Sequence, residues 1–227
     1  MGPEAELVPV PAPPSGADPR RFVAAVEAID AANAHDPNQM EVDGTTLPKE
    51  LAHAAAMTTW VRRLDPEADE AQLLAARAHH FRRWTHPRSA FPEGRAGYLR
   101  WRTEAKARQA AEVAELLTSV GYGPDVVDRV RELVGKVGLG RGDLPDVDGR
   151  PPAVQTHEDA LCLVFLTTQF DPLADQLGDD KMVDVLARTL AKMGARGRAE
   201  ALGLDLDERA LVLVAAAVER AGGAGER

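Results

Sequence analysis

Apolar side chains recur every three or four residues along most of this chain, and no stretch of convincing length alternates apolar and polar residues. The first such pattern begins at Phe22 and follows Asp18 and Pro19, residue types that favour the N-cap and the first position of a helix. Only 4% of the residues are aromatic, which also favours helices over a β-sandwich. The same spacing predicts further helices over residues 48–64, 66–84, 94–120, 124–137, 156–170, 179–193 and 207–221, with a shorter helical turn near 196–202. We therefore expect an all-α fold, an irregular multi-helix domain.

The length of 227 residues is enough for one sizeable core. Residues 1–17 contain five prolines and no helical period, which predicts a disordered or polyproline tail. A single helical domain is expected over 18–221, followed by a flexible tail over 222–227. Turn residues predict loops in the run HDPNQMEVDGTTLPKE and over 138–155.

The charge balance and the single cysteine exclude several classes of protein. A formal net charge of −9 and a pI near 5.2 argue against a general nucleic-acid coat, which needs a basic surface. Cys162 has no partner for an intramolecular disulfide or a thiolate metal cluster, and its run LCLVFL predicts a buried thiol rather than a nucleophile. The first residues lack the pattern of a signal peptide, and no apolar run is long enough for a membrane span. We expect a cytoplasmic protein.

Residues 77–108 differ sharply in composition from the rest of the chain. They hold nine of the 27 Lys and Arg residues, three of the six His and five of the ten aromatic residues. A local cleft can carry a field opposite to the net charge of the whole protein. This stretch is where we expect function to be concentrated.

Helical phase turns a small set of ionisable residues inward: His53, the adjacent His79 and His80, and Asp159. Imidazoles with a carboxylate suit a divalent transition metal such as Fe, Mn or Zn, with positions left open for water or phosphate. The order of these residues resembles that of the HD-domain superfamily of metal-dependent phosphohydrolases, whose ligands are a His, a His-Asp pair and a later Asp. His80 stands where that superfamily has its Asp, which weakens binding of a hard cation. Glu50 and Glu158 are candidates for the general base.

Each of these residues also has a purely structural interpretation. An inward His is often a hydrogen-bonded core residue rather than a ligand. Thr156 is predicted to cap the buried helix that follows it, so Glu158 or Asp159 can serve a helix N-terminus without any catalytic role.

A second set combines cations and rings that suit an anionic ligand, because guanidinium groups bind phosphate or carboxylate in bidentate fashion and rings can stack on a base. Its members are Arg82, Arg83, Trp84, Arg88, Arg95, Tyr98, Arg102 and Lys106. The helix N-terminus near Gly94 would add backbone donors. The alternative is a solvated basic face paired with Glu104, Glu112 and Glu115.

Several runs of the sequence are similar to one protein family, the domain-of-unknown-function family DUF4202. They are AIDAANAHDPN (28–38), LPKEL (47–51), ARAHHFRRW (76–84), GRAGYLRWR (94–102), HEDALCLVFL (157–166) and, more weakly, KMGARG (192–197). The resemblance covers about residues 20–210 and implies a helical, HD-like fold. It implies no established activity.

Three functions from different classes are consistent with these patterns. The first is a metal-dependent hydrolase of a phosphorylated or nucleotide-like small molecule. The second is a non-catalytic module that binds an anion, a nucleotide or, less favoured, a nucleic-acid end. The third is an iron oxygenase on the same helical scaffold.

Overall fold

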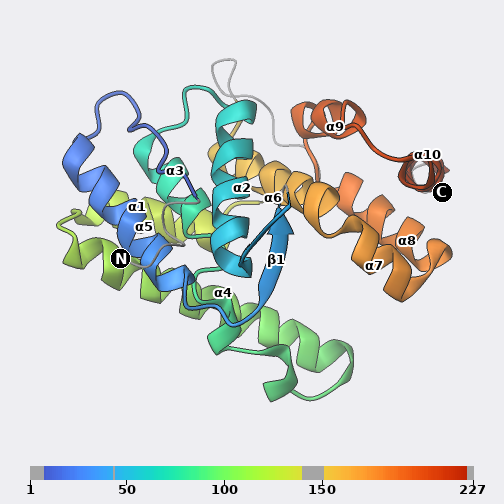
Figure 1. The fold of residues 1–227 in the computed structure, drawn as a ribbon, viewed down its shortest axis with the longest axis horizontal. Helices are drawn as coiled ribbons and strands as arrows, with labels where there is room; N and C mark the ends of the chain where they lie inside the picture. The colour runs from blue at the N-terminus through green and yellow to red at the C-terminus, as the bar shows by residue number, and fades with distance from the viewer. Residues whose placement is uncertain (1–7, 43, 140–150, 224–227) are drawn as a thin grey trace. The chain divides into compact units, whose positions relative to one another are not determined.

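A computed structural model describes residues 8–42, 44–139 and 151–223, and in them the chain is mostly helical with one small hairpin (Figure 1). The chain divides into two compact units, Met1–Val137 and Gly138–Arg227. Within the described residues, no helix combines the length and the apolar character that crossing a membrane requires.

The first unit contains five α-helices, two short 3₁₀ turns and a β-hairpin among its described residues. The α-helices are α1 (Pro19–Asn33), α2 (Lys49–Leu64), α3 (Glu70–Arg77), α4 (Gly94–Ser119) and α5 (Pro124–Gly135). The 3₁₀ turns η2 (Arg83–Thr85) and η3 (Arg88–Ala90) lie between α3 and α4. Helix α3 packs against α1, α2 and α5, and α4 packs along α5.

Helices α1 and α2 begin and bury their apolar faces as the sequence predicts. The Asp18 carboxylate caps α1 by accepting hydrogen bonds from the backbone N–H groups of Arg20 and Arg21. The predicted stripe of α2, from Leu51 through Met57 to Leu64, is buried. These two predictions are confirmed.

The run that was predicted as a loop contains an antiparallel hairpin of β1 (Gln39–Val42) and β2 (Thr45–Pro48). Val42 pairs with Thr45, so the connection has two residues, and Gly44 in it has φ +74°. An Asp-Gly pair between two short runs is the sequence signal for such a hairpin. The prediction of a fold without strands was wrong because runs of four residues are too short to show a clear alternation.

Helix α3 ends earlier than predicted. The sequence pattern continued to Trp84, whereas the helix ends at Arg77 and the chain then turns. Two residues of this turn lie in the left-handed region, His80 with φ 61° and Arg82 with φ 48°. The helical phase used to predict the directions of His79 and His80 therefore does not apply.

Residues 8–17, part of the tail predicted over 1–17, contact other segments of the first unit. Val8 is buried beside Leu47 and Leu51, and the Pro9 and Ala12 carbonyls accept hydrogen bonds from Arg77 and Arg62. The first seven residues of the predicted tail lie outside the described residues.

The second unit is helical in its described residues. Its helices are α6 (Ala153–Thr168), α7 (Phe170–Leu177), α8 (Asp179–Leu190), α9 (Ala195–Leu202) and α10 (Glu208–Gly223). Helix α6 packs on α7 and α9, and α8 packs on α7 and α10.

Two boundaries in this unit differ from the prediction. Helix α6 begins before Thr156, with Pro152 at its N-cap, and α7 continues through Asp171-Pro172, where the helix was expected to stop. Pro172 lies in the first turn of α7, where a missing N–H costs nothing. Of the loop predicted over 138–155, residues 140–150 lie outside the described residues, as do residues 224–227 of the predicted C-terminal tail.

Candidate metal centre

The first turns of α2 carry two of the candidate residues. Glu50 and His53 are three positions apart, so they project from one face of the helix. Both are buried, with 5% and 1% of their surfaces exposed. An acidic residue in the first turn also suits the positive end of the helix dipole.

His80 reaches the same place from the turn that follows α3. Its ring centroid lies 4.5 Å from that of His53 and 4.3 Å from that of His79. A non-glycine residue with positive φ is strained, and such strain persists where the surroundings hold it. The turn thus places His80 beside His53 of α2.

Glu50, His53 and His80 form a group that could hold a metal ion. One ligand atom from each residue lies within 4.8 Å of the others. The Glu50 Oε2 atom lies 3.5 Å from His80 Nδ1, and the His80 side chain is 21% exposed. Among the described residues this is the group of His, Cys, Asp and Glu side chains with that geometry. His79 is also buried, with its ring centroid 5.6 Å from that of His53.

The protonation states of the two imidazoles suit metal binding. Burial, together with the positive charges of Arg83 and Lys49, lowers the pKa of His53 to about 3. Burial also lowers the pKa of His80 well below its usual value, with His53 and Arg83 adding to the shift. Both imidazoles are therefore neutral at pH 7, the form that ligates a metal. The short contact between Glu50 and His80 is consequently not an ion pair.

Burial raises the pKa of Glu50 to about 7, although the nearby guanidinium of Arg83 opposes that shift. A cation at this position would favour the charged carboxylate and lower this pKa. The site therefore takes up a cation most readily when Glu50 has lost its proton.

His53 provides a direct test of whether these residues fit a metal. Neither its Nδ1 nor its Nε2 atom has a hydrogen-bond partner among the described residues, and both atoms are buried. A buried polar atom without a partner costs roughly 1–3 kcal/mol. A metal bound to one of the two nitrogens would remove part of this cost. The side chains of Glu50, His53 and His80 therefore fit a metal ion.

Arg83 acts electrostatically on all three residues of this group. Its guanidinium lies 4.6 Å from the centroid of the Trp101 ring, and Trp101 donates its indole N–H to the His86 carbonyl oxygen at 2.8 Å. Burial lowers the pKa of Arg83, and the Glu50 carboxylate opposes that effect. The Arg83 backbone N–H donates to the His80 carbonyl oxygen at 2.9 Å, whereas its guanidinium makes no hydrogen bond or ion pair with any residue in the part of the chain that the structure describes. Its donors therefore remain available to an anionic ligand.

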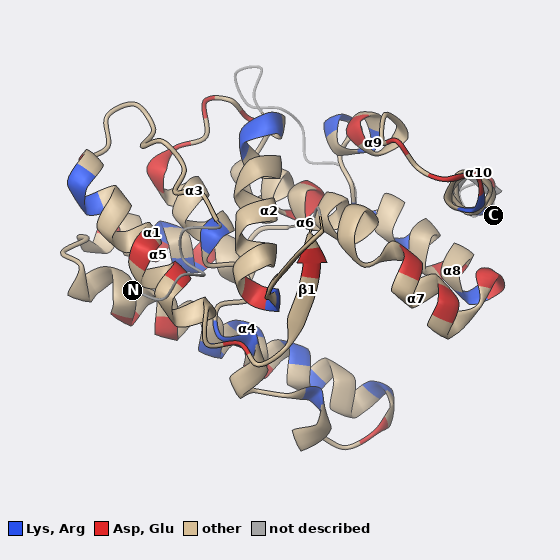
Figure 2. Cartoon of the chain, in the orientation of Figure 1, with Lys and Arg blue, Asp and Glu red and all other residues tan. Residues whose placement is uncertain are grey.

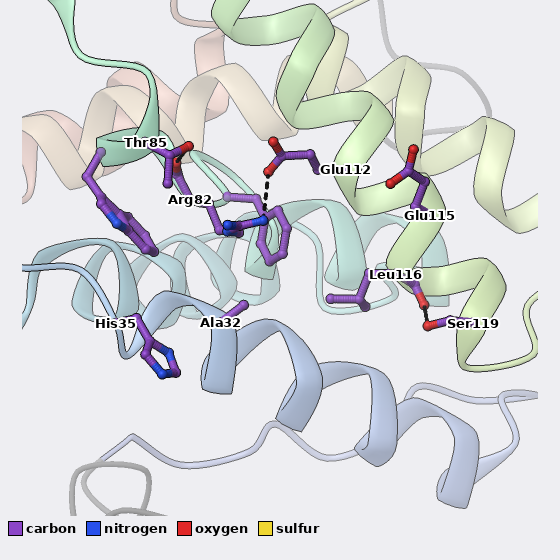
Figure 3. A pocket seen from close by; sticks show the side chains of 10 residues that line it. Ala32, His35, Arg82, Thr85, Glu112, Glu115, Leu116 and Ser119 are labelled. Atoms are coloured by element: carbon purple, nitrogen blue, oxygen red, sulfur yellow. Dashed lines mark hydrogen bonds and ion pairs between the residues drawn. The ribbon is translucent and has the colours of Figure 1, made fainter.

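Two other members of the predicted basic and aromatic set line a separate pocket of about 690 Å³. Arg82 and Trp84 contribute to it, and Figure 3 shows the Arg82 guanidinium directed at the Glu112 carboxylate, 3.6 Å away. Figure 3 also shows His35 and Glu115 on its walls, so its charges are mixed. None of the three candidate metal ligands lines this pocket.

The remaining basic residues are distributed along the loop before α4 and along the helix itself, whose first half is rich in Lys and Arg (Figure 2). Arg88 donates to the carbonyl oxygens of Phe91 and Pro92, at 2.9 and 2.8 Å, and so holds the loop. Arg102 lies over the Tyr98 ring at 5.7 Å. Lys106 lines an open groove between α4 and α5, and Arg95 is exposed. The structure thus distributes the predicted anion-binding set over several places.

Asp159 and Glu158 lie on α6 in the second compact unit and are buried. The Asp159 Oδ1 atom accepts hydrogen bonds from Gln155 Nε2 and from the backbone N–H of Gly194, each at 2.8 Å. Gly194 is the N-cap residue of α9, so this carboxylate serves a helix N-terminus, although not that of α6. The role of Asp159 as a metal ligand stays a prediction.

Comparison with known proteins places the chain in a family. The model of DUF4202, a domain of unknown function, matches residues 23–214, and the chain belongs to this family. No curated protein and no solved structure matches the chain.

Proposed function

We propose that this member of the DUF4202 family is a metal-dependent hydrolase of a small anionic molecule, of the phosphorylated or nucleotide-like class, on an HD-like helical scaffold. The observation that supports the proposal is the convergence of Glu50, His53 and His80, with both ring nitrogens of His53 buried and without a hydrogen-bond partner among the described residues. Two imidazoles and one carboxylate are the ligand set of several catalytic zinc sites, and they leave positions for water and substrate. Zn, Mn and Fe are all compatible with it.

A bound divalent ion supplies Lewis acidity and lowers the pKa of a water molecule toward neutrality. In this proposal Glu50 is a ligand rather than the general base, because it is the carboxylate grouped with His53 and His80. It takes the place that the sequence order assigned to Asp159, whose Oδ1 atom already accepts two hydrogen bonds.

Arg83 is the residue that we assign to the anionic group of the substrate. Its planar guanidinium matches two oxygens of a phosphate or carboxylate, and the Trp101 ring fixes its orientation. Its electrostatic coupling to Glu50 indicates that an anion bound there would lie near the metal. Arg83→Lys keeps the charge but loses the paired donors, so we expect a raised KM with a smaller change in kcat.

The experiment measures metal content and hydrolysis together. Protein purified without chelator is analysed for bound metal, then depleted, reloaded with Zn²⁺, Mn²⁺ or Fe²⁺, and assayed on phosphomonoesters and nucleotides. His53→Ala and His80→Ala should lose both metal and activity, whereas His35→Ala, which changes an exposed histidine just after α1, should lose neither. Failure of the wild-type protein to retain any of these metals would sink the proposal.

A second function has support from the same ligands. Two histidines and one carboxylate also form the facial triad of non-haem iron oxygenases. Oxygen consumption by the Fe²⁺-loaded protein, with no hydrolysis by the Zn²⁺-loaded form, would favour this function over the first.

The metal-independent binding module has less support. Arg82, Arg88, Arg100 and Arg108 already engage acidic side chains or carbonyl oxygens of the chain itself. Anion binding that survives a strong chelator and is lost in an Arg95→Ala, Arg102→Ala double variant would favour the binding module over the hydrolase.

A further inference from the structure

The run from Ala28 to Asn38, at the end of α1, contains three buried polar side chains. Asp30, Asn33 and Asp36 are 6%, 0% and 3% exposed. Each of them forms a hydrogen bond with a different segment near the candidate metal centre: the end of α3, the turn that carries His80, or the first turn of α2.

Asn33 contacts the strained turn that carries His80. Its Oδ1 atom accepts the backbone N–H of Arg82 at 3.1 Å, across 49 positions of sequence. Arg82 and His80 are the two left-handed non-glycine residues of that turn, so the bond lies where the backbone most needs support. The Asn33 Nδ2 atom is buried and has no hydrogen-bond partner among the described residues. Its acceptor oxygen is therefore what this side chain contributes.

Asp36 contacts the first turn of α2, from which Glu50 and His53 project. Its Oδ2 atom accepts the backbone N–H of Glu50 at 3.1 Å, and its Oδ1 atom accepts the backbone N–H of Asn38 at 2.9 Å. The first N–H groups of a helix have no acceptor within the helix, and the apolar ring of Pro48 at the N-cap cannot accept a hydrogen bond. Asp36 thus caps α2 from outside and fixes the start of the helix.

Asp30 contacts the end of α3, three residues before His80. Its carboxylate accepts two hydrogen bonds from the Arg77 guanidinium, at 2.6 Å from Nε and 2.5 Å from Nη2. This bidentate pair is almost fully buried and joins α1 to the last residue of α3. The Asp30 carboxylate therefore fixes the position of Arg77, the residue from which the chain continues into the turn.

We propose that Asn33 and Asp36 are positioning residues of the metal centre, with the Asp30–Arg77 pair as the anchor of the same device. Together they hold the His80 turn and the first turn of α2 in the relative placement that brings Glu50, His53 and His80 together. The metal part of this inference rests on the proposed function, whereas the placement of the rings does not.

The test compares Asn33→Leu, Asn33→Asp and Asp18→Ala. Asn33→Leu removes the acceptor at similar volume, and Asn33→Asp keeps an acceptor oxygen while removing an amide that donates no hydrogen bond to a described residue. Asp18→Ala removes the cap at the opposite end of the same helix and is the matched control for lost stability. Should Asn33→Leu fail to fold, Asn33→Ala is measured in its place.

Two measurements report the geometry of the candidate metal centre, one in the metal-free protein and one in the loaded protein. In metal-free protein, the nuclear Overhauser effect between the rings of His53 and His80 reports their contact, whose centroid distance is 4.5 Å. In the loaded protein, titration with Co²⁺ reports affinity, and the visible bands of bound Co²⁺ report ligand geometry. We expect Asn33→Leu to lose the ring contact and to bind Co²⁺ about 10–100-fold more weakly, as for partners that orient metal ligands elsewhere. Asn33→Asp should restore both, and Asp18→Ala should change neither.

Retention of both signals in folded Asn33→Leu overturns the inference, and so does an equal loss in Asp18→Ala. If the wild-type protein binds no Co²⁺, the proposed function fails, and the ring contact in the metal-free variants alone decides whether Asn33 positions His80.

Discussion

His53 is buried to 1% exposure with both ring nitrogens unpaired among the described residues, which makes the metal-free site a cost to stability. Replacing a buried unpaired polar group by an apolar one of similar size is often neutral or stabilising. We expect His53→Leu to leave the unfolding temperature of the metal-free protein unchanged or raised, while abolishing the rise that metal produces. Thermal unfolding with and without Zn²⁺ measures both effects. A fall in metal-free stability of more than about 2 kcal/mol would show that His53 is a structural residue.

Glu50 gives metal binding a pH dependence of definite sign. Its pKa in the folded, metal-free protein is about 7, above the usual 4.5, so binding below pH 7 must displace a proton. His53, with a pKa near 3, stays neutral in this range and adds no slope.

Metal affinity should therefore rise by roughly fivefold from pH 6 to pH 7 and by about twofold more up to pH 8, because half of the Glu50 carboxyl is still protonated at its pKa. Glu50→Gln, which carries no titratable proton, should bind more weakly and without this slope. Calorimetric titration in buffers of different ionisation enthalpy counts the protons released. An affinity of the wild-type protein that is flat between pH 6 and pH 8 contradicts the assignment.

At the scale of elements, the helices of the first unit were largely predictable, whereas the end of α3 was not. The stripe of α2 and the cap of α1 follow from local spacing and residue type. The turn at His80 contains no glycine or proline, and it is held by Asn33, which is 49 positions away from Arg82. No local pattern announces such a contact, so His80 was predicted to face inward for the wrong reason.

The candidate site was predictable only in part, because some of its contacts join residues that are distant in the sequence. His53 and His80 were predicted as ligands from residue type and order, and Glu50 was predicted only as a general base. Assigning it as a ligand required the distance between helix α2 and the turn. The family-like run at 28–38 was visible in the sequence, but its contacts with Glu50 and Arg82 were not.

Helix α9 offers a prediction about close packing. A Cβ atom on Gly197 would lie 2.5 Å from the Asp159 Cγ atom, closer than any ordinary contact, whereas one on Gly135 would lie 3.6 Å from its nearest neighbour. Gly197→Ala should therefore cost about 1–3 kcal/mol through displacement of Asp159. Gly135→Ala, in α5, should be neutral or slightly stabilising. Urea unfolding measures the stability of both variants. Equal effects of the two substitutions would contradict the close packing of Gly197 against Asp159.

At the scale of the whole molecule, the question is which parts of the chain respond to the ion. A ligand that binds only the folded state slows hydrogen exchange in the segments whose opening releases it. Metal should slow exchange in the first turns of α2 and in residues 78–82, and should leave α8 and α10 unchanged. Equal protection across both units would instead indicate general stabilisation.

The central claim is that Glu50, His53 and His80 bind one metal ion. Anomalous diffraction tests it most directly, with data from crystals of the metal-loaded protein recorded on both sides of the absorption edge of the metal. The account predicts one anomalous peak within bonding distance of a Glu50 carboxylate oxygen and of one ring nitrogen each from His53 and His80, about 2.0–2.2 Å for zinc. A loaded protein with its peak elsewhere, or with His53 outside the coordination sphere, would contradict it.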